Sequence, residues 1–441
     1  MYSFIALERQ SANFFQTTNF EPLARKGMVI KMRRVVVTGL GAVTPVGCDV
    51  GTFWYSLKNG KCGIDFITRF DASEYKSKLA AEVRDFDPSI YMEKGEIRKT
   101  DRFTQFAIAA ASQAMADSGI ENTLDAERLG VYFGSGIGGF ETLVGEYDNM
   151  IEKGHQRVSA LFIPKMISNI AAGNIAIKFK AKGPCLSFST ACATGTTAVG
   201  EAYRAIKGGY ADAIIAGGAE ASISPLAIAG FINCMALTKS EDKESASIPF
   251  DKRRNGFVMG EGSGALVLEE YEHAVARNAK IYAEVTGYGS TCDAFHVTAP
   301  DSEAIASAKA IEDCCKESGV AVAADKIYVN AHGTSTPLND KTETRALKNV
   351  FGEEAYKLNI SSTKSMTGHL LGAAGAIEAV ASVLALKENI VPPTIGYKEK
   401  DEECDLNYTP NVAKETELEM AMSVSLGFGG HNACVGFKKI N

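Results

Sequence analysis

The sequence predicts an α/β fold made of two similar halves. Short β-branched stretches alternate along the chain with apolar residues at helical spacing, a pattern typical of sheets that are covered by helices. Three short motifs also occur twice in the same order, which indicates an internal duplication. The chain has 441 residues, of which 46% are hydrophobic, and this is enough for each half to bury a core.

The composition excludes several classes of protein. The hydrophobic fraction of 46% and the charged fraction of 22% exclude a disordered, collagen-like or coiled-coil chain. No apolar run reaches the roughly 18 residues of a membrane span. With 46 basic and 53 acidic residues the net charge is −7, and no basic stripe indicates nucleic-acid binding. The ten cysteines form no CxxC pair, so we expect free thiols in a reducing compartment, the cytoplasm.

The first 31 residues differ from the rest of the chain. They carry scattered aromatic residues without apolar periodicity, and they lack the layout of a signal peptide. Glu8 and Glu21 argue against a transit peptide. We therefore expect a flexible N-terminal extension at residues 1–31, followed by two halves at residues 32–279 and 280–441.

The first half is predicted to begin with a buried strand at residues 33–37, which the TGLG turn that follows is expected to end. A helix is predicted over residues 102–118, because the large apolar side chains fall on one stripe. A strand at residues 130–133 leads into a glycine-rich turn. Further strands are predicted at residues 213–216, 264–268, 281–285 and 326–329.

The internal duplication rests on three pairs of motifs. VTGLG at residues 37–41 returns as VTGYG at 285–289, STACATG at 189–195 returns as STKSMTG at 362–368, and VYFG at 131–134 resembles IYVN at 327–330. Because the order is the same in both passes, we infer two similarly folded halves. A site between them is expected where equivalent strand ends meet.

Cys192 is the first candidate for chemistry. It follows a strand-like run at residues 186–190 and precedes a helix predicted at residues 193–207. A helix N-terminus offers unpaired N–H groups and a partial positive charge, which favour a thiolate and can stabilise an oxyanion. The position predicts a nucleophile, with a structural thiol, as for the other nine cysteines, as the alternative.

Two of the six histidines stand at predicted element boundaries. His332 follows the strand predicted at residues 326–329, and His369 begins a Gly/Ala-rich helix predicted at residues 370–387. Both can point into one cleft, where a neutral imidazole can transfer protons or donate hydrogen bonds to developing negative charge. An ordinary structural role is the alternative for each. Because no HxxxH or CxxC spacing is present, no metal site is predicted.

Lys364 lies five residues before His369, at a predicted strand-to-helix junction. A lysine there can hold a carboxylate or bias the protonation of a neighbour. Asp340 and Glu343, one helical turn apart, are the candidate partners. The alternatives are a solvated lysine and two acids that complement a helix dipole.

The turn GSGIGG at residues 134–139 matches the GxGxxG fingerprint of dinucleotide-binding proteins. It lies about 100 residues after the first predicted strand, and no clear strand-end acid follows it at the expected distance of about 20 residues. A nicotinamide-dependent oxidoreductase is therefore the weaker alternative.

From residue 33 onward the chain resembles the β-ketoacyl-[acyl carrier protein] synthases of the thiolase-like superfamily, in particular the elongating type II branch. Seven motifs carry the resemblance in the family's order. They are VTGLGAVTPVG at residue 37, STACATG at 189, GGAEAS at 217, GFVMGEG at 256, NAHGTSTPLND at 330, SSTKSMTGHLLGAAG at 361 and LGFGGHN at 426.

The resemblance implies a thiolase-like fold with a five-layered αβαβα core, and a homodimer. It implies fatty acid elongation by decarboxylative Claisen condensation of a malonyl-carrier protein with an acyl chain held as a thioester on Cys192. His332 and His369 would hydrogen-bond the malonyl thioester carbonyl, and Lys364, with Glu343 beside it, would support the site electrostatically. No cofactor is implied beyond the phosphopantetheine of the acyl carrier protein.

The resemblance also implies the parts of a substrate channel. The backbone N–H groups of Cys192 and Phe428 would form an oxyanion hole, and Phe428 would also act as a gate between flanking glycines. Walls of the acyl pocket would come from Ile137, Phe231 and Phe257, and pantetheine contacts from Thr334 and Thr336. Because the carrier is acidic in this family, a basic patch is expected at Arg98 and Lys99, next to Arg102.

Within the superfamily, a thiolase and an initiating synthase are rivals. The initiating type has asparagine where His369 stands, so the two histidines favour elongation. A polyketide ketosynthase and its non-catalytic chain-length partner are the remaining alternatives, and the retained Cys192 argues against the latter.

Overall fold

The computed structural model describes residues 33–319 and 322–440. The extension predicted at residues 1–31 lies outside this part. Among the described residues, none of the helices combines the length and the apolar character needed to cross a membrane.

A mixed sheet of ten strands forms the framework of the described part, and its order shows the duplication. From the centre outward the first half runs β1 (Val35–Val43), β7 (Gly262–Glu270), β6 (Ala213–Glu220), β4 (Leu129–Gly134) and β5 (Cys185–Leu186). The second half runs β8 (Ala283–Cys292), β14 (His431–Lys438), β13 (Met420–Gly427), β9 (Ile327–Asn330) and β10 (Asn359–Ser361). In both halves the two inner pairings are antiparallel and the two outer ones parallel.

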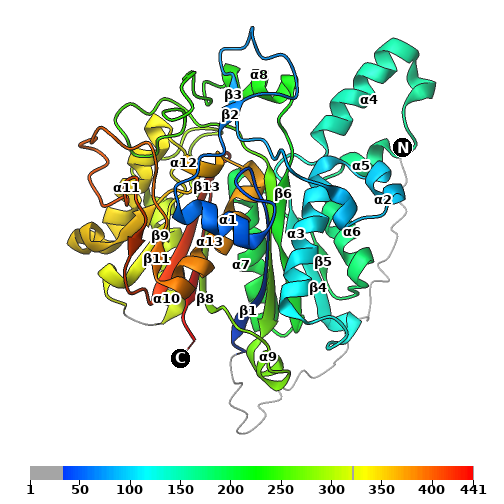
Figure 1. Cartoon of the computed structure of the whole chain (residues 1–441). Coiled ribbons are helices and arrows are strands. Elements are labelled where there is room, and N and C mark those ends of the chain that lie inside the picture. Colours follow the sequence, from blue (N-terminus) through cyan, green and yellow to red (C-terminus); the bar gives the residue numbers. More distant parts are fainter. Residues whose placement is uncertain (1–32, 320–321, 441) are drawn as a thin grey trace, which may run out of the picture. The chain divides into compact units, whose positions relative to one another are not determined.

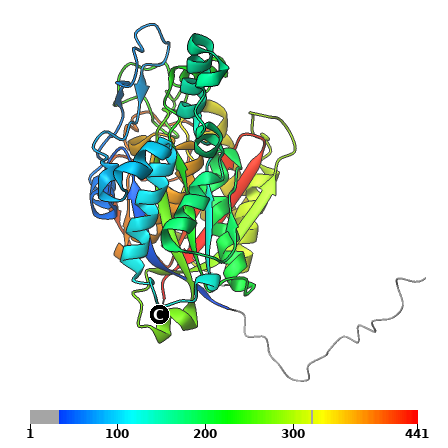
Figure 2. The ribbon, with the colours of Figure 1, turned by 90° about the vertical axis from the view of Figure 1, so that its right-hand side faces the viewer.

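The two halves join through β1 and β8, which pair antiparallel over three residues each. In the turned view of Figure 2 the red β14 and the yellow-green β8 run side by side. The predicted duplication of the fold is therefore confirmed by the strand order.

The first strand is longer than the sequence predicts. The prediction that the TGLG turn ends it is wrong, because β1 continues to Val43. The register against β7 shifts between Val37 and Gly39, so Thr38 forms a bulge within the strand. An equivalent shift in β8 leaves Thr286 as the extra residue.

Glycines in this motif serve packing rather than a turn. A Cβ atom on Gly39 or Gly41 would collide with the backbone of α3 (Arg102–Ser118). Gly287 and Gly289 meet the backbone of α10 (Ile305–Ser318) in the same way. Each half thus uses two glycines to bring a helix close to its central strand.

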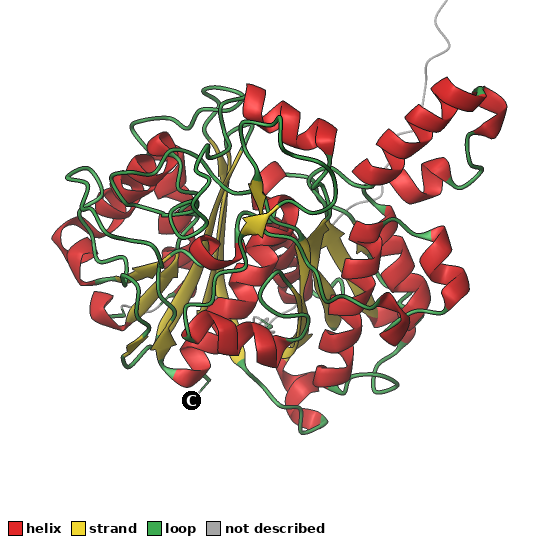
Figure 3. Ribbon diagram, turned by 45° about the horizontal axis from the view of Figure 1, so that its top comes forward, coloured by secondary structure: helices red, strands yellow, loops and turns green. Residues whose placement is uncertain are grey.

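The helices form three layers around the two half-sheets (Figures 1 and 3). α3 and α6 (Ile170–Phe179) cover the first half, while α10, with α11 (Pro337–Phe351) against it, covers the second. Between the half-sheets lie α7 (Thr194–Lys207) and α13 (Ala374–Glu388), and α13 contacts both β7 and β13. The five-layered αβαβα core implied by the resemblance is confirmed.

Shorter elements complete the described part. They are α1 (Val50–Lys58), α2 (Lys94–Lys99), α4 (Phe140–Lys153), α5 (Phe162–Met166), α8 (Pro225–Asn233), α9 (Tyr271–Ala276) and α12 (Lys364–Thr367), with the strand pairs β2 (Asp65–Phe66) and β3 (Leu79–Ala80), and β11 (Ile390–Val391) and β12 (Lys414–Glu415). α4 projects away from the sheets in Figure 1, and none of its residues is buried.

Candidate active site

Cys192 lies in a short 3-10 turn, η4 (Ala191–Ala193), that leads directly into α7. The strand predicted before it is shorter than expected, because β5 ends at Leu186. The hydroxyl of Thr194, the first residue of α7, donates to the carbonyl of Ala191 at 2.7 Å and accepts from the N–H of Thr190 at 2.9 Å. These bonds fix the turn that carries the Cys192 sulfur.

The structure brings Cys192 together with both candidate histidines. The Cys192 Sγ and one ring nitrogen of each of His332 and His369 all lie within 4.8 Å of one another. The two imidazole rings are 5.3 Å apart between centroids and nearly perpendicular, at 88°. Cys192 comes from the first half of the chain, and the histidines come from the second.

Backbone hydrogen bonds hold both histidines in place. The N–H of His369 donates to the Val258 carbonyl at 2.8 Å, and its own carbonyl accepts from Gly260 N–H at 2.8 Å. The N–H of His332, which follows β9, donates to the Glu343 carboxylate at 2.6 Å. His369 is thus fixed against a segment of the first half, and His332 against α11.

Both imidazoles are neutral at pH 7. Burial holds the pKa of His332 and of His369 well below the usual range, and the positive charge of Lys364 lowers both further. His332 Nδ1 and both ring nitrogens of His369 have no hydrogen-bond partner among the described residues. These buried nitrogens are therefore not engaged in hydrogen bonds within the described part of the chain.

The environment of Cys192 favours the thiol over the thiolate, opposite to the effect expected from its place at a helix start. Burial raises its pKa to about 12, and the carboxylates of Glu220 and Glu378 add to this effect. Lys364 and the backbone N–H of Phe428 act in the opposite direction. A thiol in this environment can act as a nucleophile only if a neighbouring base, such as a neutral imidazole, accepts its proton.

The cluster of Cys192, His332 and His369 is compact enough for one metal ion to reach all three. The charge of Lys364, however, acts on both imidazoles and would repel a divalent cation there. This donor set therefore suits proton transfer and hydrogen bonding to an anion better than metal binding.

Lys364 is buried and pairs with Glu378 on α13. The expectation that Asp340 or Glu343 holds it is wrong, because these acids bind backbone N–H groups. Asp340 accepts from the Phe250 N–H at 2.8 Å and also contacts the side chains of Asn339 and Arg254. Glu343 accepts from the N–H groups of His332 at 2.6 Å and Gly333 at 2.7 Å.

The sequence reasoning missed Glu378. A signal was present, because Glu378 is the one charged residue in the otherwise apolar stretch 370–386. A lone charge in an apolar helix normally needs a partner.

Replacing Glu378 with leucine is expected to lower the free energy of unfolding by about 3–5 kcal/mol, because Lys364 is left as an unpaired buried charge. The matched control is Glu388→Leu, which breaks the exposed pair with Lys58 and should cost about 0–1 kcal/mol. Urea unfolding of both variants measures the difference. Equal losses of unfolding free energy in the two variants would show that the buried Lys364–Glu378 pair stabilises the fold no more than the exposed Lys58–Glu388 pair.

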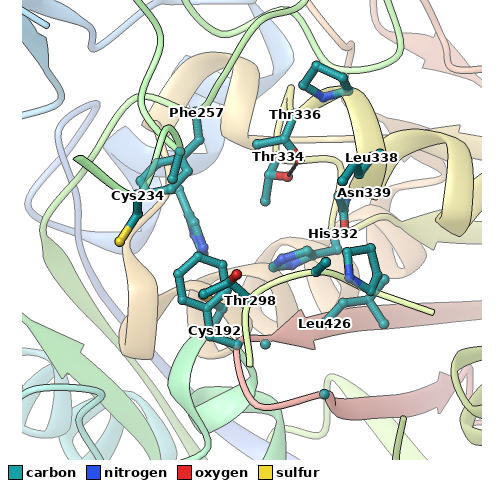
Figure 4. Close-up of a pocket in the computed structure, with 18 of the residues that line it drawn as sticks. Cys192, Cys234, Phe257, Thr298, His332, Thr334, Thr336, Leu338, Asn339 and Leu426 are labelled. Carbon is teal, nitrogen blue, oxygen red and sulfur yellow. Dashed lines mark hydrogen bonds between the residues drawn. The ribbon is translucent and has the colours of Figure 1, made fainter. Parts of the chain in front are cut away.

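A cavity of about 360 Å³ opens above the cluster (Figure 4). Its apolar walls include Phe231, Phe257, Leu426 and Phe428. In Figure 4 His332 points into the cavity and Phe257 lines the opposite side. Ile137, expected among these walls, is absent from them and is 37% exposed instead.

The other expected channel residues have defined places. The hydroxyls of Thr334 and Thr336 line the cavity and lie 3.0 Å apart. Phe428 lies 6.4 Å from Phe231 between ring centroids, next to two residues in the left-handed region, Gly429 (φ 85°) and Gly430 (φ 76°). Only glycine adopts these angles readily, so the segment is suited to movement.

The basic residues of the expected patch divide into two groups. Arg98 and Lys99 are exposed at the end of α2. Arg102 is turned inward, where it donates to the Val83 carbonyl at 2.7 Å and to the buried Glu261 at 3.2 Å. Two of the three cations therefore remain accessible.

The GxGxxG turn does not present free N–H groups for a pyrophosphate. The N–H groups of Gly136 and Ile137 donate to the buried carboxylate of Glu220, at 2.9 and 3.3 Å. Because a dinucleotide site needs such groups for its phosphates, the oxidoreductase alternative loses its support.

Comparisons with known proteins agree with this geometry. Residues 32–274 match the family model "Beta-ketoacyl synthase, N-terminal domain", and residues 282–398 match "Beta-ketoacyl synthase, C-terminal domain". The chain is 49% identical over 412 residues to 3-oxoacyl-[acyl-carrier-protein] synthase 2 of Synechocystis sp., covering 93% of this chain and 99% of that protein. The same enzyme of Coxiella burnetii is 49% identical over 414 residues, covering 93% and 100%.

Solved structures are similar over the same range. A β-ketoacyl synthase from Burkholderia phymatum superimposes with a TM-score of 0.85 at 35% identity, covering 93% of this chain and 100% of that one. A type II polyketide ketosynthase in complex with its acyl-carrier protein gives a TM-score of 0.85 at 34% identity, with the same coverage.

Proposed function

The chain belongs to the β-ketoacyl synthase family and is an acyltransferase of fatty acid elongation, and we propose that Cys192, His332 and His369 carry out its condensation reaction. The observation that carries this proposal is the 4.8 Å cluster of one sulfur and two neutral imidazoles at the cavity floor. The polyketide ketosynthases are more distant, at 34% identity against 49% for the curated relatives.

In the first step the acyl chain moves from the carrier protein to Cys192. The Cys192 thiol gives its proton to a neutral imidazole while Sγ attacks the thioester carbonyl of the carrier's pantetheine. The oxyanion accepts hydrogen bonds from the backbone N–H groups of Cys192 and Phe428. The carbon–sulfur bond to pantetheine breaks, its thiolate takes the proton, and acyl-Cys192 remains.

In the second step malonyl-carrier protein loses carbon dioxide. N–H groups of His332 and His369 donate to the malonyl thioester carbonyl, and the bond to the carboxylate breaks with its electrons entering an enolate. The enolate carbon attacks the acyl-Cys192 carbonyl, the bond to Cys192 Sγ breaks, and the thiolate takes a proton from solvent. The product is a 3-oxoacyl chain on the carrier protein.

The cavity supplies the binding surfaces that these steps need. Phe231 and Phe257 are proposed to contact the acyl chain, with Phe428 as the gate. Thr334 and Thr336, on the path to the sulfur, are proposed to contact pantetheine.

We also propose a homodimer. β5 is an edge strand of the sheet, and its Leu186 is 48% exposed. Further exposed apolar residues follow on or beside α4, α5 and α6: Leu143, Tyr147, Ile151, Leu161, Ile163 and Ile177, with Ile137 close to them in the sequence. An unpaired strand edge beside exposed apolar side chains fits a second copy of the chain.

Two further assignments are proposed. The division between the halves is placed near residue 280, in the segment between α9 and β8. All ten cysteines, each within the described part, are free, which supports a cytoplasmic location.

One assay tests the reaction and the carrier contact together. A saturated acyl-carrier protein mixed with malonyl-carrier protein should give carbon dioxide and a 3-oxoacyl chain two carbons longer. The double substitution Arg98→Glu with Lys99→Glu should raise the KM for the acidic carrier about tenfold and leave kcat unchanged. Charges at the rim of an interface act mainly on the rate at which the two proteins associate. Lys316→Glu on α10 is the control and should leave the KM unchanged.

Different results of this assay would contradict the proposed reaction and the proposed carrier contact. A chain that grows by repeated unreduced additions would identify a polyketide ketosynthase instead. An unchanged KM in the doubly reversed variant would remove Arg98 and Lys99 from the carrier contact.

A further inference from the structure

Glu220, the last residue of β6, is buried and receives four hydrogen bonds from other segments of the chain, besides a longer one of 3.5 Å from the hydroxyl of nearby Ser222. Ser135 Oγ–H donates at 2.9 Å, and the N–H groups of Gly136 and Ile137 donate at 2.9 and 3.3 Å. The fourth donor is the N–H of Gly372, at 3.0 Å. Three donors thus come from the loop after β4, and one comes from the second half, three residues after His369.

The two loops that meet at Glu220 also touch the turn that carries Cys192. The Ser189 hydroxyl donates to the Gly136 carbonyl at 3.3 Å, and a Cβ on Gly136 would lie 3.7 Å from the Ala191 carbonyl. The turn η7 (Leu371–Ala373), which contains Gly372, packs directly against η4. A shift of either loop would therefore displace the turn that carries the Cys192 sulfur.

In the second half of the chain, a buried carboxylate also holds the loop that corresponds to the loop after β4. The loop after β9, the counterpart of the loop after β4, gives its His332 and Gly333 N–H groups to the buried carboxylate of Glu343. In that half the carboxylate fixes a histidine of the site. The duplicated fold thus places one buried carboxylate on each side of the cluster.

We propose that Glu220 is a positioning residue of the active site, whose carboxylate holds the loop after β4 and the turn after His369 in place around Cys192. The proposal rests on Cys192 as the nucleophile, and it adds a residue that neither contacts the substrate nor lines the cavity. Oε1 accepts from Ser135, Ile137 and Ser222, and Oε2 accepts from Gly136 and Gly372. An amide NH2 group in place of either oxygen therefore leaves at least one backbone N–H without an acceptor.

The charge of Glu220 gives a readout that a purely structural role would lack. Glu220 and Glu378 both raise the pKa of Cys192, whereas Lys364 lowers it. The other titratable groups that face the sulfur are the neutral His332 and His369. Burial raises the pKa of Glu220 itself to about 7, so its charge is fully present only above that pH. Removing this charge should therefore lower the pKa of Cys192 in that range.

The test compares Glu220→Gln with the unaltered full chain in two assays. In the condensation assay kcat should fall about tenfold or more with the KM for malonyl-carrier protein unchanged, because the reacting groups are displaced. In alkylation of Cys192 by iodoacetamide, followed across pH, the rate should rise above pH 7, where Glu220 is charged in the unaltered chain, because a lowered pKa of Cys192 gives more thiolate.

The control is Glu201→Gln, the same chemical change on α7, at an acid that pairs with Arg204 near the surface. It should leave both assays unchanged. An unchanged kcat or an unchanged alkylation profile in Glu220→Gln would overturn the proposal.

Glu220→Asp provides a second route if the glutamine variant does not fold. Aspartate keeps the charge but shortens the reach, so kcat should fall while the alkylation profile stays in place. A full kcat or a shifted profile would overturn the proposal. Alkylation does not require condensation, so these results are distinct from a failure of the proposed function, which would appear as missing product with the unaltered chain.

Discussion

Cys192→Ala is expected to abolish condensation, with a fall in rate of at least about a thousandfold, because Cys192 is the thiol of the cavity that lies in the cluster with both imidazoles, whereas Cys234, which also lines the cavity, lies outside that cluster. Binding of malonyl-carrier protein should remain, since the imidazoles and the channel threonines are unchanged. The measurements are product formation by chromatography and malonyl-carrier binding by calorimetry.

The matched control is Cys62→Ala, which removes an exposed thiol that does not line the cavity. This variant should elongate acyl chains at the normal rate. If Cys192→Ala still elongates them, another group is the nucleophile.

The second large effect concerns His332. His332→Ala is expected to slow the release of carbon dioxide from malonyl-carrier protein at least about a hundredfold, because loss of one fixed donor typically costs about 2.7–4 kcal/mol of transition-state stabilisation. His369 would then face the enolate oxygen alone. The rate is measured with malonyl-carrier protein labelled in its carboxylate.

His155→Ala serves as the control, because His155 lies in a short 3-10 turn away from the cavity lining. It should release carbon dioxide normally. A near-normal rate in His332→Ala would exclude His332 from the decarboxylation step.

Local features of the fold were well predicted from sequence. The helix expected at residues 102–118 has those bounds in the structure, because its apolar stripe and the glycine that follows define it locally. The order of the repeated motifs also predicted the matching strand order of the halves.

The first strand shows why local rules fail in places. A Thr-Gly-rich segment is typical of a turn, but the glycines at positions 39 and 41 are required by the close approach of α3. That contact joins residues about 70 positions apart, so it cannot be read from the neighbouring sequence.

The electrostatic partners in the site were harder to predict than the grouping of Cys192, His332 and His369, which the fold brings together. The nearby acids Asp340 and Glu343 are suitable partners for Lys364 by type, yet the fold gives their oxygens to backbone N–H groups and brings Glu378 to the lysine. The raised pKa of Cys192 has the same origin, because burial of the sulfur outweighs the effect of the helix start.

The central claim is that the Cys192 sulfur carries the acyl chain. The most direct measurement is the intact mass of the chain after mixing with acyl-carrier protein, followed by mass spectrometry of the peptide that contains residue 192. The account predicts a gain equal to one acyl group, on that peptide alone and absent from Cys192→Ala. An acyl group on a different residue, or an unchanged mass, would contradict it.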